Sequence, residues 1–168
     1  MRRAAEDFLK EARALALLAA PLEDADFAAP TQFKGWTIGD VIAHLAFFDR
    51  AAVLSATSEE CFESFTAPAL TALKRGEPLT GAQNEWLAGD MGGVSGVALR
   101  DLWSEGAARL AETFAGIDPK RRLRWLGPDM SARSFITARQ MEVWAHAQAV
   151  FDALGEAREE CDRVRNIC

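Results

Sequence analysis

The sequence contains no tyrosine and only two histidines among its 168 residues. It also lacks the G-x-S-x-G motif of serine hydrolases and the Gly-Lys-Ser/Thr loop that cradles nucleotide phosphates. These absences leave few side chains for acid–base or nucleophilic chemistry. The position of each histidine therefore becomes informative.

Cysteine is also scarce, and its pattern argues against a disulfide framework. The three cysteines, Cys61, Cys161 and Cys168, form no C-x-x-C pair and are odd in number. We interpret them as free thiols in a reducing compartment. Charges throughout residues 2–13 interrupt any signal-peptide core, and the apolar run 14–22 is too short to span a membrane. The sequence therefore predicts a cytoplasmic protein with no membrane partner.

The chain is acidic, with a net charge of −6 and an isoelectric point of about 5.0. An acidic surface repels phosphate backbones, which argues against nucleic acid as a partner. One basic cluster exists, formed by residues 120–122 and Arg124. We interpret it as a solvated connector between helices. The alternative is a patch that steers anions to the mouth of a pocket.

Apolar residues recur at intervals of three and four, which predicts long amphipathic helices. These helices are expected over residues 2–20, 38–56, 59–75, 97–115 and 132–154. Thr37 and Ser131 are the expected N-caps of two of them, and Gly155 is the expected left-handed stop of the last. Pro68 either kinks the third helix or lies in the first turn of a shorter one.

Glycine is concentrated in one segment, because residues 76–96 hold six of the twelve glycines. This segment predicts a long connector with one helical turn near residues 84–87. No segment predicts a sheet. The pattern as a whole indicates an all-α fold, an antiparallel four-helix bundle with a long connector between the third and fourth helices that could act as a crossover. One domain is expected over residues 1–155, followed by a charged tail at 156–168 that could begin a further domain.

Both histidines lie on predicted inward helix faces. Glu142 and His146 are four residues apart, so their side chains project from one face of the last long helix. His44 follows Val41 by three residues and precedes Phe48 by four, so it shares their inward face. Two imidazoles and one carboxylate converging from two helices would form an open metal site.

The same spacing allows a simpler interpretation, a Glu142–His146 hydrogen bond within one helix and an unrelated core histidine at His44. If a metal is bound, Zn²⁺ suits these donors best, and Ni²⁺ or Fe²⁺ also fit them. The donor set matches the facial triad of non-haem iron oxygenases. Those triads usually lie on β-barrels, which disfavours that chemistry in an all-α chain.

Aromatic residues and loops near these positions could complete a pocket. Trp36, Trp125 and Trp144 are candidates to line it, although core packing is the simpler role of each. Residues 76–96 and 125–130 would form the rim.

Two motifs carry a resemblance to known proteins. The segment W-T-I-G-D-V-I-A-H-L, residues 36–45, resembles the second-helix motif of the DinB-like metal-binding four-helix bundles. The segment W-L-G-P-D-M-S-A-R-S-F-I-T-A-R-Q-M-E-V-W-A-H-A-Q-A-V-F-D-A-L-G, residues 125–155, resembles the metal-binding N-terminal domain of mycothiol-dependent maleylpyruvate isomerases. The resemblance implies a divalent metal, usually zinc, held at the positions of His44, Glu142 and His146.

The resemblance also implies a reaction class. In such enzymes the metal activates a low-molecular-weight thiol as a thiolate that adds to a small electrophilic substrate. The resemblance implies mycothiol as this thiol, and glutathione or bacillithiol would serve the same chemistry. Isomerisation or transfer would follow. Two departures stand out: relatives often carry Asp where this chain has Ala149, and they often continue into a C-terminal domain where this chain reads R-V-R-N-I-C.

Three functions follow as hypotheses. The first is a metal- and thiol-dependent isomerase or transferase whose partners are a small-molecule substrate and a thiol. The second keeps the fold without catalysis, as a metal-binding or interaction module that could form a homodimer. The third is a structural bundle in which the Glu142–His146 pair is a core hydrogen bond.

Overall fold

A computed structural model describes residues 1–159 and 161–167 and is mainly helical. The helices are α1 (Arg2–Leu18), α2 (Ile38–Thr57), α3 (Glu59–Lys74), α4 (Thr80–Gly89), α5 (Gly96–Ala115) and α6 (Ala132–Leu154). Two 3₁₀ helices, η1 (Asp24–Ala28) and η2 (Asp162–Asn166), and two short strands, β1 (Arg122–Leu123) and β2 (Met130–Ser131), complete the described elements. No described helix is long and apolar enough to cross a membrane.

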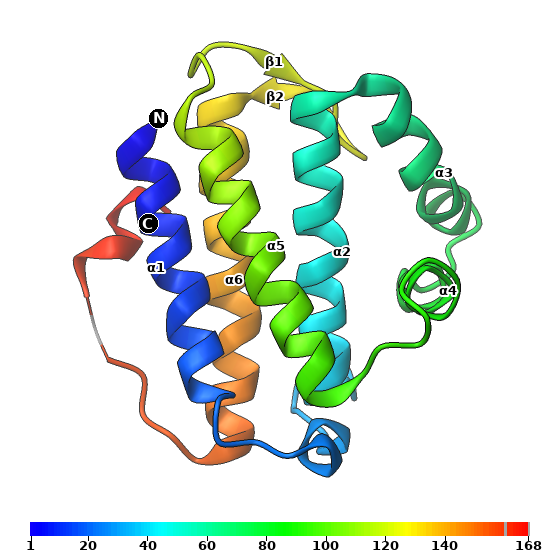
Figure 1. The fold of residues 1–168 in the computed structure, drawn as a ribbon, viewed down its shortest axis with the longest axis vertical. Coiled ribbons are helices and arrows are strands. Elements are labelled where there is room, and N and C mark those ends of the chain that lie inside the picture. Colours follow the sequence, from blue (N-terminus) through cyan, green and yellow to red (C-terminus); the bar gives the residue numbers. More distant parts are fainter. Residues whose placement is uncertain (160, 168) are drawn as a thin grey trace.

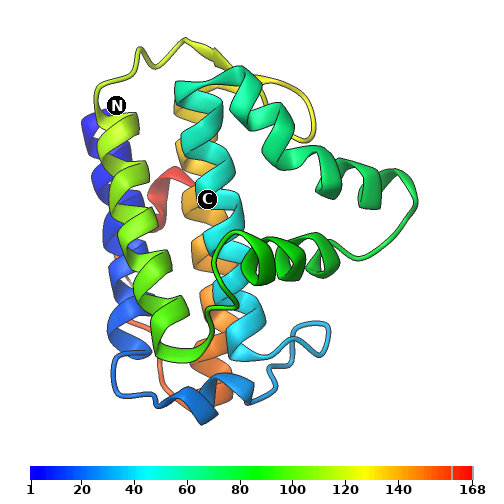
Figure 2. The same cartoon turned by 45° about the vertical axis from the view of Figure 1, so that its right-hand side comes forward.

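Helices α1, α2, α5 and α6 form a four-helix bundle (Figure 1). The chain runs in one direction in α2 and α5 and in the opposite direction in α1 and α6 (Figure 1). A parallel pair of helices cannot be joined by a short loop, because the chain must return to the end of the bundle where the first helix began. Helices α3 and α4 make this return as a hairpin beside α2 (Figure 2).

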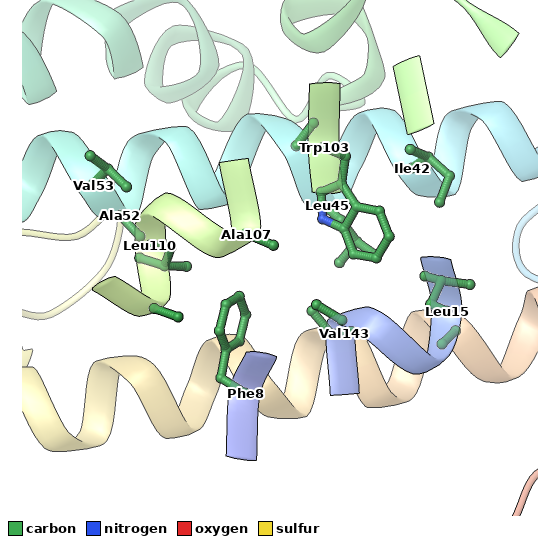
Figure 3. Packing of buried hydrophobic residues seen from close by; sticks show 14 of the residues in the cluster. Phe8, Leu15, Ile42, Leu45, Ala52, Val53, Trp103, Ala107, Leu110 and Val143 are labelled. Atoms are coloured by element: carbon green, nitrogen blue, oxygen red, sulfur yellow. The ribbon is translucent and has the colours of Figure 1, made fainter. Parts of the chain in front are cut away.

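The bundle closes around one apolar core. Figure 3 shows inward-pointing side chains from all four helices, among them Phe8, Leu15, Leu45, Trp103, Leu110 and Val143. Each of these side chains is fully buried. Burial of a large apolar side chain contributes about 1.5–3 kcal/mol to the stability of the fold. The packed core thereby fixes the spacing between α2 and α6.

Local signals at the helix ends explain where the helices begin and stop. The Thr37 hydroxyl accepts from the Asp40 N–H at 3.0 Å, and Asp40 Oδ2 accepts from the Thr37 N–H at 2.9 Å, which is the predicted capping box. Ser131 caps α6 through the Ser134 N–H, and Gly155 ends that helix with φ 70°. These caps set the register of the two helices that carry the histidines.

The segment 76–96 differs from its prediction, because it contains the ten-residue helix α4 rather than one helical turn. This helix has no side-chain N-cap. Burial of Ala82, Gln83 and Leu87 against the bundle and α3 stabilises it instead. Tertiary packing of this kind overrides a weak local preference.

Two smaller expectations also change. Helix α3 continues through Pro68, so the shorter helix beginning near that proline is wrong. Strands β1 and β2 pair antiparallel, with Leu123 opposite Met130, so the expectation that no strand forms is wrong for this turn. The strand pair brings residues 122–123 and 130–131 side by side in the connection that leads into α6.

The described part of the tail packs on α1. Arg158 and Arg163 pair with Glu11, whose side chain is 1% exposed, and Arg165 pairs with Asp7 at 2.8 Å. Two tail guanidiniums thus compensate one buried carboxylate. Cys61 and Cys161 are free thiols, as predicted. Cys168 lies outside the described residues.

Gly96 lies where the crossover formed by α3 and α4 joins α5. Its φ is +57°, and Asp24 Oδ1 beside it accepts from the Val97 N–H at 2.9 Å. A Cβ on Gly96 would overlap that carboxylate and lie 3.1 Å from the Asp24 Cα. We expect Gly96→Ala to lower the free energy of unfolding by about 1–3 kcal/mol, measured by urea denaturation.

Gly106 in the middle of α5 is the matched control, because a Cβ added there would meet no neighbouring atom within 4 Å and its φ is not positive. Gly106→Ala should raise the free energy of unfolding by about 0.5–1 kcal/mol. A Gly96→Ala protein as stable as the wild type would contradict this account of the crossover.

Candidate metal centre

The structure brings the three predicted ligand residues together. His44 projects from α2, while Glu142 and His146 project from α6. Glu142 Oε2 lies 3.5 Å from His44 Nε2 and 3.2 Å from His146 Nε2. One ligand atom from each residue falls within 4.8 Å of the other two. We call these three residues the triad.

The triad has the donors and the spacing of a divalent metal site. Metal–ligand bonds of about 2.1 Å in a tetrahedron place neighbouring donors about 3.4 Å apart, close to both Glu142 distances. His44 Nε2 is buried and has no hydrogen-bond partner in the described part of the chain. Because an unpaired buried polar atom is costly, this nitrogen points to a missing partner.

Burial and neighbouring charges set the protonation of the triad. Desolvation lowers the pKa of His44 from 6.5 to about 4, although the nearby Glu142 carboxylate acts in the opposite direction. The hydrogen bond with His146, and then the nearby His44 imidazole, hold the pKa of Glu142 well below its usual range. At neutral pH the site therefore offers a neutral His44 imidazole and an ionised Glu142, the forms that bind metals.

Aromatic rings enclose the two imidazoles. Trp36 stacks on His146 with ring centroids 5.7 Å apart, and Phe33 contacts the same imidazole edge-on at 4.9 Å. Phe48 packs against His44 at 4.7 Å. The Glu142 side chain stays 34% exposed, so the triad opens to solvent on the carboxylate side. The predicted pocket role of Trp36 thus agrees with its position, whereas Phe33 carried no sequence signal.

The other predicted lining residues lie elsewhere. Trp125 packs into the core against Phe48 and Phe135. Trp144 is 38% exposed and lies beneath the Arg158 guanidinium. Trp125 therefore has the simpler core-packing role, whereas Trp144 lies at the surface rather than in the core.

The basic cluster at residues 120–124 is solvent-exposed apart from Leu123. Arg124 pairs with Glu59, Glu63 and Asp129. It ties α3 to the connector that leads into α6, which agrees with the interpretation of the cluster as a solvated connector.

Two features near the triad were not predicted. Gln83 of α4 is 1% exposed and hydrogen-bonds to His44 Nδ1 at 3.0 Å. Arg139 and Asp49 form a buried ion pair at 3.1 Å, and the Trp103 indole donates to the same carboxylate at 3.0 Å. Burial raises the pKa of Asp49, while Arg139 and Trp103 act in the opposite direction.

A cavity of about 480 Å³ lies apart from the triad. Residues of α2, α3, α4 and α5 line it, and its α2 residues lie on the side of the helix away from His44. Its lining includes Trp86 and Trp103. None of its lining residues is a triad residue.

Comparison with known proteins shows which family the chain resembles. The family model described as mycothiol maleylpyruvate isomerase N-terminal domain matches residues 8–151. Two uncharacterized proteins of Mycobacterium tuberculosis, from strains CDC 1551 / Oshkosh and ATCC 25618 / H37Rv, are each 38% identical over 162 residues. These matches cover 96% of this chain, which spans 60% of the length of each relative.

Two solved structures share the fold. The crystal structure of a mycothiol-dependent maleylpyruvate isomerase has a TM-score of 0.58, covering 86% of this chain and 60% of that one. A mutant of such an isomerase has a TM-score of 0.63, covering 97% and 65%. Sequence identity is 22% in both cases, so the likeness concerns the fold. The predicted DinB-like all-α bundle is confirmed.

The lowered pKa of His44 predicts acid sensitivity of the metal-free protein. The unfolded chain takes up a proton at this residue as the pH falls below 6.5, whereas the folded chain does so only near pH 4. His44 should therefore lower the free energy of unfolding by about 2 kcal/mol between pH 7 and pH 5. The stabilising contribution of Glu142 is present above pH 4.5 and is lost as the pH falls further.

Urea denaturation in the presence of a chelator measures this dependence. His44→Gln removes the titrating group, so its stability should fall less between pH 7 and pH 5. An identical pH dependence in the wild type and the variant would show that His44 is not buried as described.

Proposed function

The chain belongs to the mycothiol maleylpyruvate isomerase N-terminal domain family, and from this membership we propose that it is the metal-binding domain of a thiol-dependent isomerase or transferase. The triad would hold the metal, with zinc as the best match to two imidazoles and one carboxylate. The observation that carries the proposal is the convergence of both histidines on one carboxylate, with His44 Nε2 buried and without a hydrogen bond among the described residues.

The triad and the surrounding aromatic residues have separate roles in the proposed site. His44, Glu142 and His146 would hold the ion from one side and leave its remaining positions open toward the exposed edge of Glu142. Phe33, Trp36 and Phe48 keep water away from the imidazoles. A divalent metal bound here supplies positive charge that lowers the pKa of a thiol, so that a thiolate forms near neutral pH.

The reaction class follows from thiolate chemistry. The thiolate sulfur forms a bond to an electrophilic carbon, and the electron pair of the attacked double bond moves to an activating group. Rotation about the resulting single bond and loss of the same thiolate complete an isomerisation with no net change in the thiol. Release of the adduct instead, with uptake of one proton, gives a transfer reaction.

The thiol and the substrate are named by chemical class. Family membership favours mycothiol, and glutathione offers the same sulfur chemistry. The substrate is a small electrophile with an activated carbon–carbon double bond. Because the chain spans 60% of the length of its relatives, the activity of the longer protein is part of this proposal.

A second function, a metal-binding module without catalysis, is favoured by one residue. Ala149 lies one helical turn after His146 and is half-buried. It places a methyl group where the family resemblance described above implies an aspartate in many relatives. A missing carboxylate at this position would leave the metal ligands intact and remove a contact to thiol or substrate.

Metal content tests the triad directly. We expect about one zinc per chain in the purified protein by elemental mass spectrometry, and near-complete loss in His44→Ala and in Glu142→Ala. Glu112→Ala is the matched control, because Glu112 is an exposed glutamate of α5. Full zinc content in folded His44→Ala would overturn the site, and circular dichroism establishes that each variant is folded.

Cobalt substitution separates the catalytic function from the binding module. Addition of mycothiol or glutathione to the Co²⁺-loaded protein should change its visible spectrum, because a sulfur donor entering the coordination shell creates charge-transfer absorption. The change should be absent with a thiol whose sulfur is methylated. A spectrum that no small thiol alters would leave the non-catalytic module as the function.

A further inference from the structure

Gln83 stands out because it is the point where the crossover hairpin reaches the triad. Its side chain is 1% exposed and lies 3.0 Å from His44 Nδ1. In the described chain, α3 and α4 make no other hydrogen bond or ring contact to His44, Glu142 or His146. The second nitrogen of His44 is therefore controlled by one residue from outside the bundle.

The tautomer of His44 decides whether this imidazole can bind a metal. Binding through Nε2 requires a lone pair on that atom, so the ring proton must lie on Nδ1. An Nδ1–H group buried in the protein needs an acceptor, and Gln83 is the residue within reach. The amide then presents its oxygen, Oε1, to the ring.

The opposite orientation of the same amide fits the metal-free protein. With its nitrogen toward His44, as in the structure, Gln83 donates to Nδ1 and the ring proton lies on Nε2, facing Glu142. A half-turn of the amide exchanges the two arrangements without moving the rest of the side chain. Glutamine serves both because it carries a donor and an acceptor at nearly the same position.

We propose that Gln83 is a positioning residue that holds His44 in the tautomer required for metal binding and thereby makes the α3–α4 crossover part of the metal centre. The proposal rests on the proposed function, in which the triad holds a metal. This role explains why a glutamine is fully buried on α4, a helix with no side-chain N-cap. Residues that orient metal-binding histidines in this way commonly change metal affinity 10–100-fold when they are removed.

Two substitutions at this position separate orientation from packing. Gln83→Met keeps the size and flexibility of the side chain and removes both hydrogen-bonding groups. Gln83→Glu keeps an acceptor that can receive the Nδ1 proton. Leu87→Ala is the control, because it removes a buried side chain from the same helix and Leu87 has no contact with His44 among the described ring and hydrogen-bond contacts.

The measurement is the zinc dissociation constant of each protein, obtained by competition with a coloured chelator, together with the melting temperature of the metal-free form. We expect zinc binding about 10–100-fold weaker in Gln83→Met. Gln83→Glu should bind zinc at least as tightly as the wild type. Leu87→Ala should lose thermal stability and keep its zinc affinity.

The outcomes distinguish this inference from the proposed function. Wild-type affinity in Gln83→Met, or equal losses in Gln83→Met and Gln83→Glu, would overturn the positioning role while leaving the triad in place. A wild-type chain that binds no zinc would overturn the metal centre and this role with it. Weaker zinc binding in Gln83→Met alone, with no spectral response of the cobalt protein to thiols, would keep the positioning role and remove the thiol reaction.

Discussion

The structure depends on one shared carboxylate. Glu142 Oε2 lies between two imidazoles that come from different helices, 3.5 Å from His44 and 3.2 Å from His146. This arrangement exists only if α2 and α6 keep their separation and register to within a fraction of an ångström. The apolar core, the caps at Thr37 and Ser131 and the crossover that lets α2 and α5 run parallel all serve that requirement.

A buried ion pair between Asp49 and Arg139 lies next to the triad in the bundle. Asp49 lies five residues after His44 on α2, and Arg139 lies three residues before Glu142 on α6. Their buried ion pair, with the Trp103 indole from α5, ties three helices of the bundle together. The positive charge of Arg139 also helps to hold down the pKa values of His44 and Glu142. Breaking a buried pair of this kind is strongly destabilising. Because the Asp49–Arg139 pair joins the two helices that carry the triad, it also holds the triad in place.

Sequence periodicity was enough for the helices and for the inward faces of the two histidines, because both depend on local rules. The spacing alone left open whether His44 meets Glu142 and His146, and the family resemblance supplied that expectation. Helical spacing places Glu142 beside His146, and the caps and glycine stop mark the ends of the helices. Contacts between residues distant in sequence left no local pattern. The partner of Gln83 lies 39 residues away, and the partners of Glu11 lie in a tail about 150 residues later. Helix α4 was missed because glycines flank it and burial, rather than a capping residue, stabilises it.

The central claim is that one metal ion lies at the meeting point of the three triad side chains. Anomalous X-ray diffraction from a zinc-loaded crystal, recorded on both sides of the zinc absorption edge, tests it most directly. The account predicts one strong peak within bonding distance of His44 Nε2, a Glu142 carboxylate oxygen and a His146 ring nitrogen, with the Gln83 amide on the far side of His44. A well-ordered crystal with no peak there, or with zinc bound only at Cys61 or Cys161, would contradict it.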